Sequence, residues 1–85
     1  MAYRAVFRRS AARDLDGLAR PIHNRVWRAI TALAVDPRPR GAKLLAGPER
    51  IWRIRVGDYR ILYVVDDTLT KLVILRILHR SKAYR

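Results

Sequence analysis

Three arginines, Arg53, Arg55 and Arg60, are spaced so that they gather on one side of a short β-hairpin. In the stretch Ile51–Tyr63, apolar residues alternate with arginine, which is the period of a half-buried strand. Gly57-Asp58 is a two-residue turn of the kind that suits glycine first, and it pairs Arg55 with Arg60. Like charges facing each other on a sheet repel, so this face is predicted to bind an anion.

The end of the chain adds three further candidates, His79, Arg80 and Tyr84. If the last strand lies beside the hairpin, its end approaches the arginines, although adjacent strand residues point to opposite faces. Arginines stabilise the charge of a pentacoordinate phosphate transition state, Tyr84 can stack on a base or orient a 2′-hydroxyl, and His79 or Tyr84 can transfer protons. There is a simpler alternative for each of these residues. The three arginines would form a solvated sheet face, His79 would end its strand without a chemical role, and Tyr84 would pack the tail onto the core.

Composition points to a polyanionic partner. The 19 basic residues comprise 16 arginines and 3 lysines, against 7 acidic residues, and the net charge is +12. Guanidinium groups match phosphate oxygens, so RNA, DNA or an acidic protein is expected. A codon bias towards arginine would explain why arginine outnumbers lysine, but it would not explain why acidic residues are so few.

Length and composition also restrict the class of protein. Eighty-five residues predict one domain spanning 1–85, and the absence of cysteine fits a reducing, cytoplasmic compartment. Two histidines are too few and too far apart for an obvious metal site, so no cofactor is expected. No apolar run approaches the roughly 20 residues that span a bilayer, so no membrane partner is expected.

Hydrophobic periodicity predicts the elements that position these residues. In chain order they are a strand at Tyr3–Arg8, a helix at Ala11–Leu18 with Ser10 as N-cap, a helix from Pro21 to about Asp36, the two hairpin strands and a strand at Lys71–His79. The last strand is almost continuously apolar, as expected of a central strand buried on both faces. This β-α-α-β-β-β order predicts an α+β fold, with two N-terminal helices packed on a mainly antiparallel four-stranded sheet.

The segment Pro37–Arg50 is predicted to be a loop. Its basic residues, and one in the tail, can contact an RNA backbone, although a solvated connector is the simpler interpretation. They are Arg38, Arg40, Lys43, Arg50 and, in the tail, Lys82. No paired catalytic carboxylates are evident, since Asp58 has a conformational reason to lie in a turn and Glu49 is only a minor candidate.

Several motifs resemble the RelE/ParE superfamily of bacterial toxins, and together they cover nearly the whole chain. They are RRSAARDLDGL at Arg8–Leu18, Asp36-Pro37, Lys43-Leu44, WRIRVGDYRILY at Trp52–Tyr63 and LRILHRSKAYR at Leu75–Arg85. The R-x-G-x-Y-R core is specific to the superfamily, but the RelE and ParE branches share it.

The resemblance to the RelE branch implies a ribosome-dependent endoribonuclease that cuts messenger RNA in the A site. It implies a metal-free reaction in which the 2′-hydroxyl attacks the scissile phosphate, leaving a cyclic phosphate and a 5′-hydroxyl. The positions that match the family's active face are Arg53, Arg55, Arg60, Arg80 and Tyr84. It further implies a RelB-like antitoxin, with an acidic helix over the basic surface, and operator DNA binding only together with that antitoxin.

The chain departs from the family pattern at Arg53 and Arg55, where well-known active members have lysine. Arginine, with a pKa above about 12, can clamp phosphate but is a poor general base. This moves proton transfer to His79 or Tyr84, or weakens catalysis. The alternatives are a ParE-type gyrase poison without nuclease activity and a non-catalytic nucleic-acid-binding or corepressor module. The retained Arg60, Arg80 and Tyr84 favour the nuclease.

Overall fold

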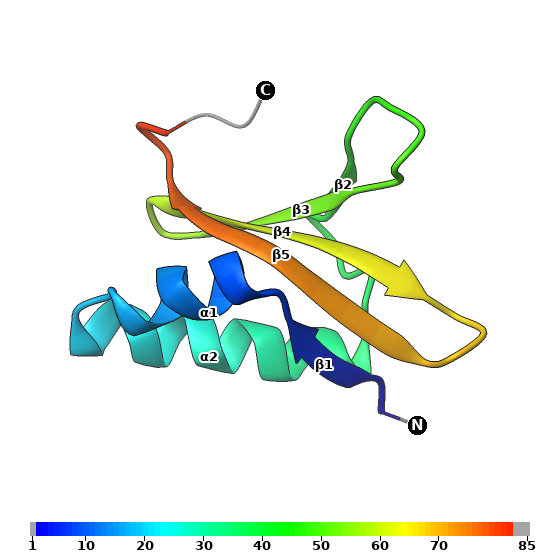
Figure 1. Cartoon of the computed structure of the whole chain (residues 1–85), viewed down its shortest axis with the longest axis horizontal. Coiled ribbons are helices and arrows are strands. Elements are labelled where there is room, and N and C mark those ends of the chain that lie inside the picture. The colour runs from blue at the N-terminus through cyan, green and yellow to red at the C-terminus, as the bar shows by residue number, and fades with distance from the viewer. Residues whose placement is uncertain (1, 83–85) are drawn as a thin grey trace.

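The computed structural model describes residues 2–82. In chain order the elements are β1 (Arg4–Phe7), α1 (Arg9–Asp16), α2 (Arg20–Val35), β2 (Lys43–Leu44), β3 (Trp52–Val56), β4 (Tyr59–Asp66) and β5 (Lys71–His79). The strands form one sheet in the order β1-β5-β4-β3-β2, and both helices lie on the same side of it (Figure 1). The predicted α+β class, with two helices on a mainly antiparallel sheet, is confirmed.

The sheet has a fifth strand that the sequence did not predict. Lys43 and Leu44, in the segment expected to be a loop, pair antiparallel with Arg53 and Trp52. Two residues are too few to show a period of two, so this strand has no signal in the hydrophobic pattern. At the other edge, β1 runs parallel to β5.

The hairpin has the predicted turn and register. Gly57 has a φ of +58°, which glycine adopts without steric cost, and Val56 lies opposite Tyr59. Arg55 therefore lies opposite Arg60. The predicted alternation is confirmed, because Ile54 and Ile61 are buried beneath the helices.

The core lies between the helices and the sheet. The apolar stripe of α2 supplies Val26, Ile30 and Leu33, all buried, while Ile22 packs partly buried beside them. The remaining buried members of the core are Ala11, Leu15, Ile54, Ile61, Tyr63, Leu72, Ile74 and Ile77. The Tyr63 hydroxyl donates a hydrogen bond of 2.7 Å to the carbonyl of Pro37, so its polar atom is satisfied inside the core.

The start of α1 differs from the prediction. The helix begins at Arg9, and Ser10 is not its N-cap; instead the Ser10 hydroxyl donates to the carbonyl of Leu75 at 3.0 Å. The reason lies in β5, because β1 pairs only with Lys71–Ile74 and leaves the rest of that edge open. Asp14 accepts a 2.8 Å hydrogen bond from the backbone N–H of Ile77. Polar side chains of α1 thus take the place of a neighbouring strand.

A β-bulge sets which residues of β5 face the helices. Leu62 pairs with Arg76 and Tyr63 with Ile74, so Leu75 has no partner on β4. The prediction that β5 is buried on both faces is only half right: Leu72, Ile74 and Ile77, which face the helices, are buried, and the residues on the other side are intermediate in exposure.

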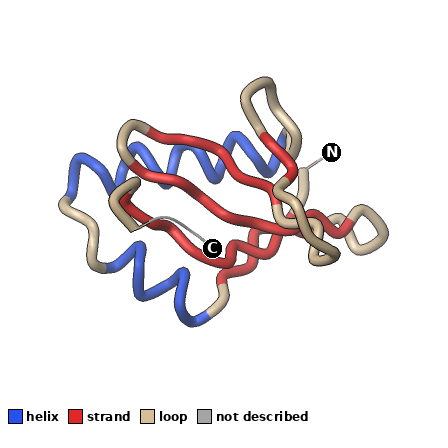
Figure 2. Tube along the Cα trace, turned by 90° about the horizontal axis from the view of Figure 1, so that it is seen from above, coloured by secondary structure: helices blue, strands red, loops and turns tan. Residues whose placement is uncertain are grey.

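No helix of the described chain covers the other side of the sheet (Figure 1, Figure 2). We call this side the open face, and the pairing register assigns to it Arg53, Arg55, Arg60, Leu62, Arg76 and Leu78.

Candidate functional site

Arginines from three segments meet at the hairpin end of the open face. A hollow of about 300 Å³ is lined there by Arg55, Arg60 and Arg80 together with the turn residues Gly57 and Asp58 and by Tyr59. We call it the hairpin hollow. Because its charged lining contains three guanidinium groups and one carboxylate, it is suited to an anion.

Arg80 reaches this hollow because the end of β5 is tied to the hairpin turn. The backbone N–H of Arg80 donates a 2.7 Å hydrogen bond to the carbonyl of Asp58. The side chains add only a long ion pair, with Arg80 Nε 3.9 Å from Asp58 Oδ1 and both side chains mostly exposed. Exposed pairs of this kind contribute little, so the backbone bond is the main tether.

Arg53 lies next to this cluster in an electrostatically unfavourable position. Its Nε is buried and has no hydrogen-bond partner among the described residues. Burial lowers the pKa of Arg53, and the neighbouring charges of Arg55 and Arg60 lower it further. The guanidinium nevertheless keeps its charge at neutral pH, so an anion bound beside it would relieve both the repulsion and the missing hydrogen bond.

A second and larger depression follows the outer edge of β3. It has a volume of about 740 Å³ and lies between α2 and β3. Because β2 pairs only with Trp52 and Arg53, no strand of the described residues pairs with Ile54–Val56 on that side. We call this depression the edge groove. Its apolar lining is Ala29, Ala32, Leu33, Ile54 and Val56, and its basic lining is Arg40, Lys43, Arg53 and Arg55.

Two of the residues predicted to contact RNA, Arg40 and Lys43, line this groove, which shares Arg55 with the hairpin hollow and is also lined by one acidic residue, Asp36. Arg38 does not join them. Its guanidinium donates to both carboxylate oxygens of Asp67, at 2.8 and 3.3 Å, and lies 5.6 Å from the centre of the Trp52 ring. Hydrogen bonds from Arg38 and from Tyr3 lower the pKa of Asp67. Arg38 thus has a structural partner already.

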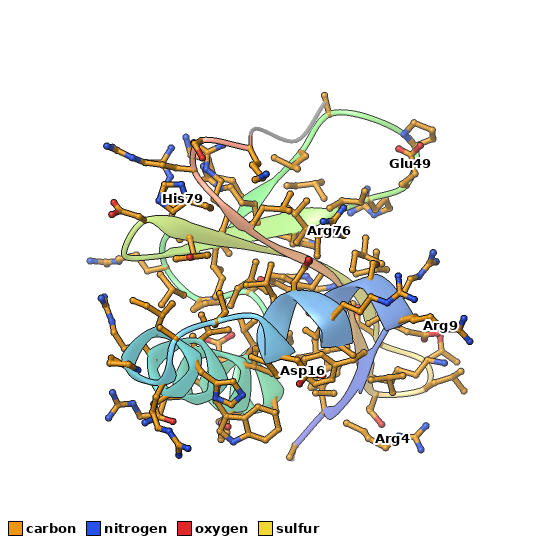
Figure 3. All side chains as sticks on the ribbon, turned by 60° about the vertical axis from the view of Figure 1, so that its left-hand side comes forward. Arg4, Arg9, Asp16, Glu49, Arg76 and His79 are labelled. Carbon is orange, nitrogen blue, oxygen red and sulfur yellow. The ribbon has the colours of Figure 1, made fainter. Side chains whose placement is uncertain are left out.

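His79 lies on the other side of the sheet from the arginines. It is paired with Tyr59, which faces the helices, and the two rings meet edge-on with centres 5.2 Å apart. Its Nδ1 lies 2.9 Å from the Ser81 hydroxyl and accepts a 3.1 Å hydrogen bond from the Ser81 backbone N–H. Figure 3 shows His79 at the end of the sheet. Lys82 shares a hollow with His79 rather than with Arg55, Arg60 and Arg80.

The two remaining predicted residues add no contact to this cluster. Arg50 is exposed, has a φ of +55° in the loop before β3, and lines none of the depressions described above. Tyr84 lies outside the described residues.

Sequence reasoning missed two side chains that shape the site. Arg25 of α2 reaches the hairpin turn, where a Cβ built on Gly57 would lie 3.0 Å from its Nη1. Asp14 fixes the second half of β5 through Ile77 and forms an ion pair of 2.8 Å with Arg76. The only signal for Arg25 was its place off the apolar stripe of α2, and Asp14 resembled an ordinary helix-start acid.

Two features are absent from residues 2–82. No three histidine, aspartate or glutamate side chains come together in a way that could hold a metal ion. Neither α1 nor α2 is long and apolar enough to cross a membrane.

Comparison with known proteins places this geometry in a family. A family model described as the ParE toxin of the type II toxin-antitoxin system parDE matches residues 5–84. Toxin RelG of Mycobacterium tuberculosis is 37% identical over 86 residues, which is 100% of this chain and 99% of the relative. Toxin RelE of the same organism is 32% identical over 84 residues, which is 98% of this chain and 87% of the relative.

Solved structures agree. The toxin-antitoxin complex RelBE2 from M. tuberculosis superposes with a TM-score of 0.81 at 36% identity, covering 94% of this chain and 100% of that one. The archaeal RelE-RelB complex from Pyrococcus horikoshii superposes with a TM-score of 0.80 at 26% identity, covering 98% of this chain and 100% of that one. The isolated E. coli RelE toxin shares the fold, with a TM-score of 0.81 over 99% of this chain and 87% of that one, although the sequence identity is 21%. The chain therefore belongs to the RelE/ParE superfamily, as a toxin of a type II toxin-antitoxin system.

Proposed function

We propose that this toxin is a ribosome-dependent endoribonuclease that cuts messenger RNA in the A site. The observation that carries the proposal is the meeting of Arg55, Arg60 and Arg80 around one hollow, beside Arg53 with its unpartnered Nε. Such a cluster fits a phosphodiester, because guanidinium groups bind phosphate oxygens with paired, charge-assisted hydrogen bonds.

The chemistry follows from where negative charge develops. The 2′-oxygen of the preceding ribose attacks phosphorus, the bond to the 5′-oxygen breaks, and the products are a 2′,3′-cyclic phosphate and a 5′-hydroxyl. The pentacoordinate transition state carries more charge on its non-bridging oxygens than the substrate does. Arg55 and Arg60, which are direct cross-strand partners, hold those oxygens, and Arg80 approaches from the end of β5.

Proton transfer needs a group other than these arginines. The 2′-hydroxyl must lose a proton and the leaving 5′-oxygen must gain one, whereas guanidinium stays protonated at neutral pH. The position of His79, on the helix side of the sheet, argues against its direct participation. We therefore assign base stacking and proton transfer to Tyr84, on the strength of the family resemblance.

The neighbouring basic residues extend the RNA contact. Arg40 and Lys43 continue the positive surface from the arginine cluster into the edge groove. Backbone phosphates on either side of the cut would bind them, with a strong dependence on salt. Arg50 and Lys82 would supply weaker contacts at the margins.

The edge groove also suits an antitoxin. Solved relatives include RelE proteins in complex with RelB antitoxins. An acidic amphipathic segment would place apolar side chains against Ile54 and Val56 and carboxylates against Arg53 and Arg55. Such a segment covers two of the phosphate-binding arginines and so accounts for inhibition. The complex of the two proteins would bind operator DNA.

A gyrase poison is the second candidate, because the matching family model is described as a ParE toxin. Primer extension on programmed ribosomes decides between the two. The proposed nuclease produces a metal-independent cut within the A-site codon, whereas a gyrase poison leaves the message intact and abolishes supercoiling by purified gyrase. An intact A-site codon at saturating toxin would refute the nuclease.

A further inference from the structure

A second hollow lies further along the open face. Its volume is about 410 Å³, and its floor is apolar, made by Ile51, Val64 and Leu75. The β-bulge contributes to it, because Leu75 is the residue of β5 without a partner on β4. We call it the bulge hollow. It shares no lining residue with the hairpin hollow.

Two segments form its walls. The loop between β2 and β3 supplies Glu49, and the junction of β1 and α1 supplies Arg8 and Ser10. Figure 1 shows that this loop rises on the side of the sheet away from the helices, and Figure 3 shows Glu49 at its tip. The hollow thus opens on the same side of the molecule as the arginine cluster.

Its charged groups are of both signs, with the carboxylate of Glu49 against the guanidinium groups of Arg8 and Arg76. Glu49 is the chain's single glutamate, and it forms no ion pair with any described residue, although the net charge is +12. Its carboxylate lies against Gly47, where a Cβ would be 2.7 Å from Oε1. Arg76 uses Nε and Nη2 to bind Asp14, and its side chain is 42% exposed, so Nη1 is left to donate elsewhere.

This combination selects among the bases. A carboxylate accepts a hydrogen bond from an exocyclic amino group, and a guanidinium donates to a carbonyl oxygen. Guanine and cytosine carry both an amino group and a carbonyl group, whereas adenine lacks the carbonyl and uracil lacks the amino group. The aliphatic floor would bury the face of a planar base.

The hollow is close enough to the arginine cluster to hold part of the same RNA. Arg60 of the hairpin hollow and Val64 of the bulge hollow are four residues apart on β4. A strand rises about 3.4 Å per residue, so the separation along the sheet is about 14 Å. That distance corresponds to a few nucleotides of single-stranded RNA.

We propose that the bulge hollow binds a guanine or cytosine base a few nucleotides from the phosphate held by Arg55, Arg60 and Arg80. Glu49 accepts a hydrogen bond from the base's amino group, and Arg76 donates to its carbonyl oxygen. The inference rests on the proposed nuclease function and adds to it a base preference set by Glu49.

The first test measures cleavage of programmed ribosomes carrying messages that differ by one base at each position around the A-site codon. The wild-type toxin should prefer guanine or cytosine at one position by about tenfold, the effect of a good base-edge pair. Glu49→Ala should lower cleavage of those messages to the level of the adenine and uracil messages, whose cleavage stays unchanged. Asp16→Ala, which removes an exposed carboxylate of α1 that lines neither hollow, is the matched control for lost negative charge and should keep the preference.

The second test works whether or not the message is cut. Short RNA carrying 6-thioguanosine is photo-crosslinked to the full-length toxin, and the modified residues are mapped by mass spectrometry. Crosslinks at Ile51, Val64 or Leu75 that Glu49→Ala weakens support the base site even if the toxin does not cleave, in which case the nuclease function fails alone. Crosslinks confined to other residues, or a cleavage preference that Glu49→Ala leaves intact, overturn the inference.

Discussion

Arg38 donates to both carboxylate oxygens of Asp67, at 2.8 and 3.3 Å, and so joins the segment after α2 to the turn after β4. Asp67 also accepts a 2.7 Å hydrogen bond from the hydroxyl of Tyr3, just before β1. Three segments that are distant in sequence are held at one carboxylate. An arginine that the sequence assigns to RNA binding therefore has a structural role at this end of the sheet.

Replacing Arg38 with alanine should lower thermal stability slightly and leave A-site cleavage unchanged, because the ion pair is partly exposed and distant from the hairpin hollow. Asp67→Asn should have a similar effect, and the double variant should be little worse than either single one. Thermal melts of the four proteins measure this coupling. Loss of cleavage with unchanged stability would return Arg38 to the RNA-binding surface.

The same pair should respond to acid. The pKa of Asp67 is lowered in the folded protein, so its contribution is complete above the ordinary aspartate pKa of about 3.9 and is lost as the pH falls through the lower folded value. The stability difference between wild type and Asp67→Asn should therefore shrink below about pH 4. Melting temperatures recorded at decreasing pH measure it, and a difference that persists at the lowest pH would contradict the assignment.

Removing a guanidinium from the hairpin hollow should abolish most cleavage without unfolding the protein. Arg60→Ala and Arg80→Ala are each expected to lower the rate of A-site cleavage by about 10²- to 10³-fold, the usual cost of losing one transition-state donor. Circular dichroism and antitoxin binding should stay as in the wild type. Arg28→Ala, which removes an exposed arginine of α2, is the matched control for lost positive charge. Unfolding of either hollow variant would show a structural role instead.

Local patterns were sufficient to predict most of the fold. The two-residue turn at Gly57-Asp58 determines the register of β3 and β4. The pairing of Arg55 with Arg60 was therefore predictable, because each lies two residues from the turn. The bulge that leaves Leu75 unpaired could not be predicted in this way, because it depends on how β5 meets two different neighbours. Ser10 was misassigned for a related reason, since its partner, the carbonyl of Leu75, lies 65 residues away.

The candidate site was predictable where it depends on alternation along strands, and not where it depends on contacts between distant segments. The strand period placed Arg53, Arg55 and Arg60 together and restricted His79 or Arg80, but not both, to their face. It could not show that Asp58 binds the backbone of Arg80, nor that Arg38 already has a carboxylate partner. Both contacts join elements whose relative position is set only when the core packs.

Removing the charge of Arg53 should raise the stability of the protein and lower its cleavage activity. Its Nε is buried without a partner among the described residues, and its pKa is lowered by burial and by two neighbouring arginines, so the folded state is destabilised by this charge. Arg53→Met keeps the apolar stem and removes the charge, and it should stabilise the protein by about 0.5–2 kcal/mol. Cleavage should fall at least tenfold, because one phosphate ligand is lost. Chemical denaturation and the A-site assay measure the two effects, and destabilisation of the variant would contradict the prediction.

The hydrogen bond from Tyr63 to the carbonyl of Pro37 should be visible in alkaline solution. Burial raises the pKa of Tyr63 to about 12, from the ordinary value of 10.0. Above pH 10 the unfolded chain therefore loses a proton that the folded chain retains, so the contribution of Tyr63 is complete below about pH 10 and declines between about pH 10 and 12. Tyr63→Phe should lower the free energy of unfolding by about 1–3 kcal/mol at neutral pH, because the buried carbonyl loses its partner. The gap between the two proteins should narrow as the pH rises through this window, which denaturation at several pH values measures. Tyr59→Phe is the control, because it removes a hydroxyl that makes no hydrogen bond to protein in the described chain. If Tyr59→Phe lowers the free energy of unfolding by as much as Tyr63→Phe, the hydrogen bond of Tyr63 contributes nothing and the prediction is wrong.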